Sequence, residues 1–199
     1  EPALRSVEVT DQRLIDQKMI ELDGTANKSR LGANSILGVS MAAARAAAKS
    51  SSIELYQYIA QLNDRRSFAL PIPMFNLING GKHADNNLDI QEFMVIPDRL
   101  EGYHNQLSAG QLIFTTLGQI LDGDHIARTF GDEGGYAPNL DTNEMACDYL
   151  VRAIEDSGYK KWDEVSLGLD VAASNVPPTF DKTPSRYLGL LQDFPILSL

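Results

Sequence analysis

The chain has 199 residues, of which 43% are hydrophobic and 22% are charged, a composition that is ordinary for a soluble globular protein. Its 17 basic and 27 acidic residues give a formal net charge of −10, which argues against a general nucleic-acid or anionic-membrane surface. A lone cysteine, Cys147, excludes an internal disulfide and is interpreted as a small buried hydrophobe. The sequence shows neither a signal peptide nor a run of about 18 apolar residues, so we expect a cytoplasmic protein without a membrane span.

The first third of the chain is predicted to be helical. One helix is expected around Asp11–Glu21, before a break that contains Gly24. A longer helix should run to Ala48, with Asn34 as its N-cap and two alanine runs that favour close helix packing. A third helix is predicted over Ile53–Leu62, where apolar residues recur at helical spacing. The polar residues 63–67 form a candidate domain boundary.

The rest of the chain predicts strands that alternate with helices. Two strands come first, the second closed by Pro97, and are followed by two helices, a short buried strand, a further helix and a last strand. The expected strands are Ala69–Ile78, Ile90–Ile96, Val165–Leu169 and Pro195–Leu199, and the two long helices are Tyr103–Leu121 and Thr142–Ser157. This order predicts an α/β fold.

Four polar or glycine-rich segments stand out against this pattern. Residues 131–139 read Gly-Asp-Glu-Gly-Gly-Tyr-Ala-Pro-Asn, a loop that can hold a carboxylate out into a pocket. Residues 79–93 read Asn-Gly-Gly-Lys-His-Ala-Asp-Asn-Asn-Leu-Asp-Ile-Gln-Glu-Phe, and residues 167–174 read Leu-Gly-Leu-Asp-Val-Ala-Ala-Ser. Residues 27–40, Asn-Lys-Ser-Arg-Leu-Gly-Ala-Asn-Ser-Ile-Leu-Gly-Val-Ser, form the fourth segment.

Together these segments resemble enolase, the magnesium-dependent enzyme that dehydrates 2-phosphoglycerate to phosphoenolpyruvate. The resemblance runs from about residue 20 to Ser174, with a weaker tail to Leu199, and its motifs fall in the family's order. The His-Ala-Asp-Asn-Asn form at residues 83–87 is most similar to bacterial members.

The resemblance implies a particular fold and domain organisation. It predicts the first half of an enolase-type (β/α)8 barrel, preceded by the helical end of an α+β capping domain. Residues 1–64 would be the C-terminal helical part of the capping domain, and residues 65–199 the N-terminal half of the barrel domain. In that family the barrel begins with an irregular antiparallel pair of strands.

The enolase reaction removes a weakly acidic proton from carbon 2 and expels hydroxide from carbon 3, which requires a general acid. Glu133 matches the family's general acid, and Glu92 matches a second carboxylate near the leaving group. Several carboxylates in one cleft are useful because burial and mutual repulsion keep at least one of them protonated. The competing interpretation of Glu133 is a solvated glutamate in a turn.

Gln91, Glu92 and His83 are the expected substrate-binding residues. Gln91 should lie beside Glu92 and contact the substrate. In a plain strand Glu92 would share a face with the apolar Ile90, an unusual place for a glutamate unless it faces the mouth of the barrel. His83 matches the flexible-loop histidine that closes over the substrate, and the preceding Gly-Gly pair agrees with a mobile lid; a solvated or capping histidine is the alternative.

Asp170 is the expected metal ligand. It ends an apolar strand, the position at which α/β barrels place functional side chains, and it matches the first carboxylate ligand of the tightly bound Mg²⁺, a cation that prefers oxygen ligands. The competing interpretation is an aspartate that caps a following helix.

Several parts that the family needs have no counterpart in this sequence. They are the serine loop for the second magnesium, two further carboxylate ligands, the lysine general base, a Ser-His-Arg segment and a second substrate lysine. Residues 175–178, Asn-Val-Pro-Pro, also replace the usual glutamate and aromatics. We therefore expect a piece of a longer enolase, which would be a homodimer. An open edge at Pro195–Leu199 should make such a piece unstable alone.

Two other functions remain open on the sequence. A catalytically inactive enolase-like binding or scaffold protein is favoured by the missing general base. A related barrel enzyme that acts on sugar acids would share the enolate chemistry, but the Glu133 loop and the Gln91-Glu92 pair look specific to enolase. Magnesium-dependent turnover of 2-phosphoglycerate distinguishes enolase from both.

Overall fold

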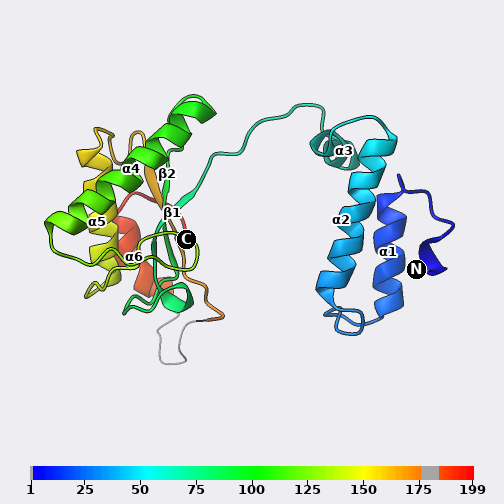
Figure 1. Cartoon of the computed structure of the whole chain (residues 1–199), viewed down its shortest axis with the longest axis horizontal. Coiled ribbons are helices and arrows are strands. Elements are labelled where there is room, and N and C mark those ends of the chain that lie inside the picture. The colour runs from blue at the N-terminus through cyan, green and yellow to red at the C-terminus, as the bar shows by residue number, and fades with distance from the viewer. Residues whose placement is uncertain (1, 176–183) are drawn as a thin grey trace. The chain divides into compact units, whose positions relative to one another are not determined.

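The computed structural model describes residues 2–175 and 184–199, and the chain divides into two compact units, residues 1–69 and 70–199 (Figure 1). Of the unusual stretch at residues 175–178, only Asn175 lies among the described residues. Among the helices that the structure describes, none combines the length and the apolar character needed to cross a membrane.

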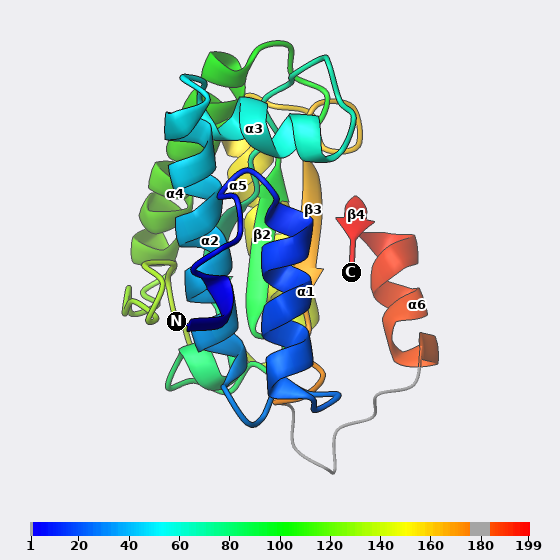
Figure 2. The ribbon, with the colours of Figure 1, turned by 90° about the vertical axis from the view of Figure 1, so that its right-hand side faces the viewer.

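The first unit is helical, as predicted. It contains a short 3-10 turn, η1 (Pro2–Leu4), and three α-helices: α1 (Gln12–Asp23), α2 (Ala33–Ser50) and α3 (Leu55–Leu62). Helices α1 and α2 lie side by side (Figure 2). The side chain of Asp11 accepts a hydrogen bond from the Leu14 N–H and caps α1, which ends at Gly24 in the left-handed conformation.

The predicted cap of α2 is wrong. The helix begins at Ala33, and Gly32, with φ of 88°, occupies the position before it, so Asn34 lies within the first turn. Glycine reaches this positive φ without a steric penalty, which lets the chain enter the helix two residues earlier than an asparagine cap would.

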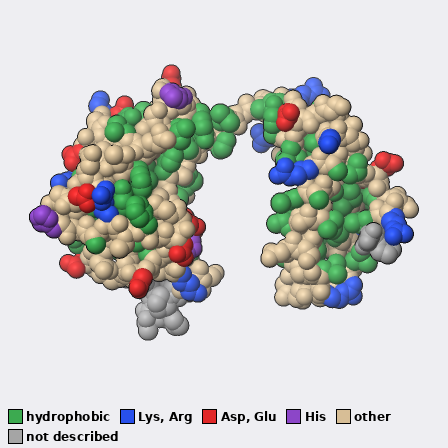
Figure 3. Space-filling view, viewed as in Figure 1, with side chains coloured by type: hydrophobic (Ala, Val, Ile, Leu, Met, Phe, Trp, Pro, Cys, Tyr) green, Lys and Arg blue, Asp and Glu red, His purple; other side chains and the backbone are tan. Residues whose placement is uncertain are grey.

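The alanine-rich part of α2 packs closely only near its C-terminal end. Ala47 and Ala48 are buried with Tyr58 of α3, whose hydroxyl donates to the Thr10 carbonyl. Larger apolar side chains of α2, including Leu37 and Met41, are exposed. Figure 3 shows such hydrophobic side chains on the surface of the helical unit.

The second unit is built on a four-stranded sheet in the order β1-β2-β3-β4. Its strands are β1 (Phe75–Asn79), β2 (Glu92–Ile96), β3 (Ser166–Asp170) and β4 (Ile196–Ser198). Strand β2 is antiparallel to both β1 and β3, whereas β4 is parallel to β3. The expected antiparallel opening pair is therefore present.

All four strands begin later than the sequence predicted, β3 and β4 by one residue and β1 and β2 by more. Residues 69–74 are not in a strand, because Pro71 and Pro73 have no N–H to donate to a neighbouring strand. Strand β2 starts at Glu92 rather than Ile90, so Gln91 and Ile90 belong to the loop before it. The plain-strand alternative, in which Ile90 and Glu92 share one face of a regular strand, is therefore not what the structure shows.

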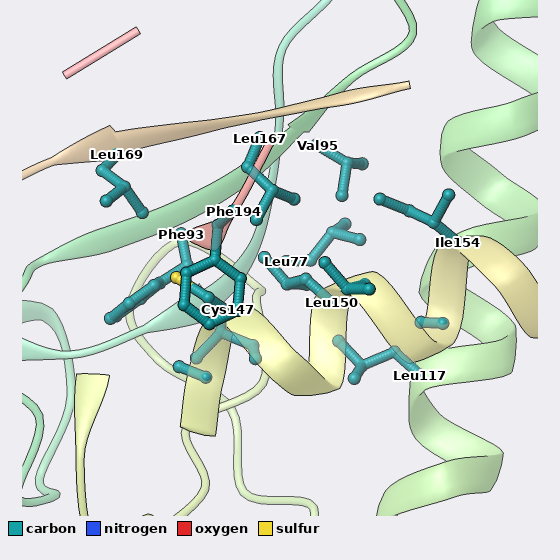
Figure 4. Close-up of a cluster of buried hydrophobic side chains, with 14 of the residues drawn as sticks. Leu77, Phe93, Val95, Leu117, Cys147, Leu150, Ile154, Leu167, Leu169 and Phe194 are labelled. Carbon is teal, nitrogen blue, oxygen red and sulfur yellow. The ribbon is translucent and has the colours of Figure 1, made fainter. Parts of the chain in front are cut away.

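One face of the sheet is covered by α4 (Tyr103–Gly123), α5 (Asn143–Asp156) and α6 (Pro184–Asp193). Side chains of β2 and β3 meet α4 and α5 in a single core (Figure 4), where Phe93, Val95, Leu117, Leu150 and Leu167 are fully buried. The thiol of Cys147 lies in the same core, and burial raises its pKa to about 12. The interpretation of Cys147 as a packing residue is confirmed.

Truncation of a core side chain on α5 should therefore be costly. We expect Leu150→Ala to destabilise the second unit by about 2–5 kcal/mol, because Leu150 is fully buried and the cavity left behind loses its contacts. Leu112→Ala, on the exposed side of α4, makes the same chemical change and should cost less than about 0.5 kcal/mol. Urea unfolding followed by circular dichroism measures both; equal losses would contradict the core described here.

Candidate functional site

Polar residues from three strands lie side by side at one end of the sheet. Because β2 runs against its neighbours, its first residue lies beside the last residues of β1 and β3. Asn79 is the cross-strand partner of Glu92, and Glu92 is the partner of Asp170. Direct partners in neighbouring strands point to the same side of a sheet, so these three residues form a row on one face.

A bulge in β1 adds a fourth residue to this face. Asn76 pairs with Met94 and Ile78 pairs with Phe93, so two steps along β1 match one step along β2. This extra residue places Asn76 and Asn79 on the same side of the sheet, although three positions separate them. That side is opposite to the helix-covered core, to which Phe93 belongs.

His83 and Glu133 meet at Glu92, the middle residue of this row. The Nδ1 atom of His83 lies 3.3 Å from Oε2 of Glu133 and 3.8 Å from Oε1 of Glu92. One potential ligand atom from each of the three residues lies within 4.8 Å of the other two. The amide Nδ2 of Asn76 donates to the same Glu133 Oε2 at 3.0 Å. We refer to His83, Glu92 and Glu133 as the acid cluster.

Backbone hydrogen bonds hold the two loops that supply His83 and Glu133. The N–H of Gly80 donates to the Gln91 carbonyl at 2.9 Å and the N–H of Gly81 to the Leu88 carbonyl at 2.8 Å, which closes the 80–91 loop on itself. The N–H of Asp132 donates to the His83 carbonyl at 3.0 Å. The histidine loop and the glutamate loop are therefore joined next to the side chains that meet.

Glycines are needed where the 131–135 loop passes Asn79. Asn79 is fully buried, and within the described part of the chain its side-chain amide makes no hydrogen bond. A Cβ on Gly131 would lie 2.6 Å from the Asn79 Cβ, and one on Gly135 would overlap the Asn79 Oδ1. The lack of side chains at these glycines thus lets the loop approach β1 closely.

The environment of Glu92 favours its protonated form. Burial is the largest cause that raises the pKa of Glu92, followed by its hydrogen bond with Glu133 and the negative charges of Glu133 and Asp170. The nearby His83 acts in the opposite direction, but the pKa remains above its ordinary value. Two carboxylates that share a hydrogen bond carry a proton more readily than either does alone.

Gln91 lies outside the acid cluster. Its buried side chain lines a separate cavity of about 350 Å³ between the 80–91 loop and the start of the segment after β3. There its Oε1 accepts from the Asn175 amide at 3.4 Å, and Asn175 Oδ1 accepts from Lys82 Nζ at 3.4 Å. Gln91 is adjacent to Glu92 in the chain, but its side chain lines this cavity and does not contribute to the acid cluster.

Asp170 ends β3 with an exposed side chain. Its Oδ1 accepts a hydrogen bond from the Ala172 N–H at 2.8 Å, and its carbonyl accepts from the Gln91 N–H at 3.0 Å. No helix begins between residues 171 and 175, so the helix-capping alternative for Asp170 is wrong over this described stretch. The carboxylate instead closes a tight turn in which Ala172 has a φ of 48°.

Asn76 and Asn79 were not predicted as site residues. A signal was present, because asparagine is depleted in strands and two of them occur in the five residues of β1. What the sequence did not reveal was the bulge between them, which brings both to the face of Glu92.

The described residues of the second unit form a mixed four-stranded sheet with helices on one face, which is an α/β class of fold. Residues 67–192 match the family model described as enolase, C-terminal TIM barrel domain, and residues 1–59 match that of the enolase N-terminal domain. The chain belongs to the enolase family. The mixed α/β fold predicted from the sequence, with part of an enolase-type barrel, is confirmed.

A methyl group at Gly135 should disturb the site through packing alone. We expect Gly135→Ala to destabilise the chain by about 1–3 kcal/mol, since the new Cβ overlaps Asn79 Oδ1 and lies 3.1 Å from the Asn76 carbonyl oxygen. Gly123→Ala is the matched control, because nothing lies within 4 Å of its Cβ. Urea unfolding should show a loss for Gly135→Ala only; a harmless Gly135→Ala would contradict this loop geometry.

The raised pKa of Glu92 makes a prediction about pH. A folded state that holds the proton more tightly than the unfolded state loses stability as pH rises from the ordinary glutamate value of 4.5 through the raised value. Glu92→Gln mimics the protonated carboxyl, so its stability relative to the natural chain should increase between pH 4.5 and pH 7.5.

Urea unfolding at both pH values measures this difference. Glu101→Gln, at an exposed glutamate before α4, serves as the control and should show little pH-dependent change. A Glu92→Gln variant that became relatively less stable at pH 7.5 would show that Glu92 is stabilised as a carboxylate.

Proposed function

We propose that this chain carries part of the active site of an enolase that converts 2-phosphoglycerate to phosphoenolpyruvate and water. The observation that supports it most is the meeting of two glutamates from different loops with one histidine, with Nδ1 of His83 3.3 Å from Glu133 and 3.8 Å from Glu92. Elimination of a poor leaving group needs a proton donor at the departing oxygen, and a coupled carboxylate pair is suited to hold that proton.

Each predicted residue has a proposed role in this reaction. Glu133 protonates the departing hydroxide, and Glu92 shares the proton with it. His83 is the last residue of the 3-10 turn η2 (Gly81–His83), and its Nδ1 lies next to the carboxylates of Glu92 and Glu133. Closure of its loop would bring the imidazole to the substrate. Gln91 contacts the substrate from the neighbouring cavity.

We propose Mg²⁺ as the cofactor, with Asp170 as one of its ligands. The exposed carboxylate at the end of β3 fits this role, since Mg²⁺ is bound through one or two carboxylates together with water and substrate oxygens. The bound ion would stabilise negative charge on the substrate carboxylate. The acid cluster suits Mg²⁺ less well, because one of its three groups is an imidazole.

The lysine base and the other ligands of the resemblance would come from segments of a longer polypeptide. The sheet is compatible with this, because among the described residues β4 pairs only with β3 and leaves an edge that a barrel would continue. Residues 1–64 and 65–199 would then belong to the capping and barrel domains. We further propose a bacterial-type, cytoplasmic homodimer. The alternative is a catalytically inactive enolase-like scaffold protein.

Activity assays with two polypeptides test this proposal. A polypeptide of only these 199 residues should not turn over 2-phosphoglycerate, because it lacks the base. The natural gene product should be heavier than 21.9 kDa and should form phosphoenolpyruvate only with Mg²⁺. Glu133→Gln in that product should lower kcat by about 100- to 10,000-fold.

The outcomes separate the alternatives. Turnover by the 199-residue polypeptide would overturn the idea that it is only a piece of the enzyme. A natural product that binds Mg²⁺ without turning over 2-phosphoglycerate would support the scaffold function instead. Glu101→Gln is the control for Glu133→Gln and should leave kcat unchanged.

A further inference from the structure

Asn76, the second residue of β1, contacts the acid cluster. Its Nδ2 donates to Glu133 Oε2 at 3.0 Å, and His83 Nδ1 lies 3.3 Å from the same oxygen. The side chain of Glu133 is 45% exposed and stands on a loop rather than in the sheet. A carboxylate in such a place needs a fixed partner to keep one position.

The strand fixes Asn76 more firmly than the loop fixes Glu133. Asn76 is paired with Met94 in the β1–β2 ladder, and this pairing places its side chain on the face of Glu92, which is two residues before Met94 in β2. The backbone carbonyl of Asn76 also lies next to Gly135, so the loop that carries Glu133 passes directly over this residue. The donor therefore belongs to the rigid part of the site.

We propose that Asn76 is a positioning residue that clamps the Glu133 carboxylate beside Glu92 and His83. An amide N–H can only donate, so it makes Glu133 Oε2 an acceptor and favours negative charge on that oxygen. The proton shared by the two glutamates then lies on Glu92 or on the other oxygen of Glu133. Its catalytic consequence rests on the enolase function proposed above; the clamp itself does not.

The clamp can be observed by nuclear magnetic resonance in the full chain. The side-chain amide protons of Asn76 should resonate downfield of those of Asn105, whose Nδ2 donates to the uncharged Glu101 carbonyl. Glu133→Gln should move the Asn76 signals upfield toward those of Asn105, whereas Glu92→Gln should leave them downfield. His83 and Glu92 are titratable groups of the same cluster, and Asp170 lies beside Glu92 in the sheet, so all spectra are compared at one pH.

Kinetics of the natural enzyme test the consequence for the reaction. Asn76→Ala should lower kcat by about 10- to 100-fold, with KM changed by less than about threefold. Asn76→Asp keeps the shape but replaces the donor with an acceptor, so its loss should be larger. Asn105→Ala should change neither constant.

The two measurements fail in different ways. Asn76 signals that do not respond to Glu133→Gln would overturn the clamp, as would an Asn76→Asp variant with the natural kcat. An enzyme without turnover would refute the proposed function but not the clamp, because the amide signals report the contact directly.

Discussion

The reversed direction of β2 is the constraint on which the site depends. Because β2 is antiparallel to β1 and β3, its first residue lies beside the last residues of those two strands. Glu92 is therefore set between Asn79 and Asp170 by backbone pairing alone. Because the ladder hydrogen bonds fix this register, a slip of one residue would turn Glu92 into the helix-covered core and Phe93 out of it.

The residues of the acid cluster come from two kinds of element, a paired strand and two loops. Glu92 belongs to the sheet, whereas His83 and Glu133 belong to loops that are shaped by glycine. Close packing of the second loop on Asn79 and the amide of Asn76 compensate for that difference. Burial near two other carboxylates raises the pKa of Glu92, so the carboxyl group that the sheet holds is one whose protonated form is favoured.

Much of this arrangement could be predicted from the sequence, for identifiable reasons. Apolar periodicity located the helices, and the starts predicted at Asp11 and Thr142 lie within one residue of the first residues of α1 and α5. Predictions failed where backbone geometry overrides pattern, as at the Gly32 entry to α2 and at the prolines before β1. The bulge between Asn76 and Ile78 has no sequence signature, so the role of Asn76 emerged only from three-dimensional pairing.

The hydrogen bond from the Asp132 N–H to the His83 carbonyl has a mechanical consequence. A movement that lifts the histidine loop must either break this bond or pull the glutamate loop with it. If the bond survives, the two loops swing as one body, and Glu133 leaves Glu92 at the moment that His83 does. Opening the loops over the acid cluster would then also separate Glu133 from Glu92. The proposed proton donor would be in its active position only when the loops are closed.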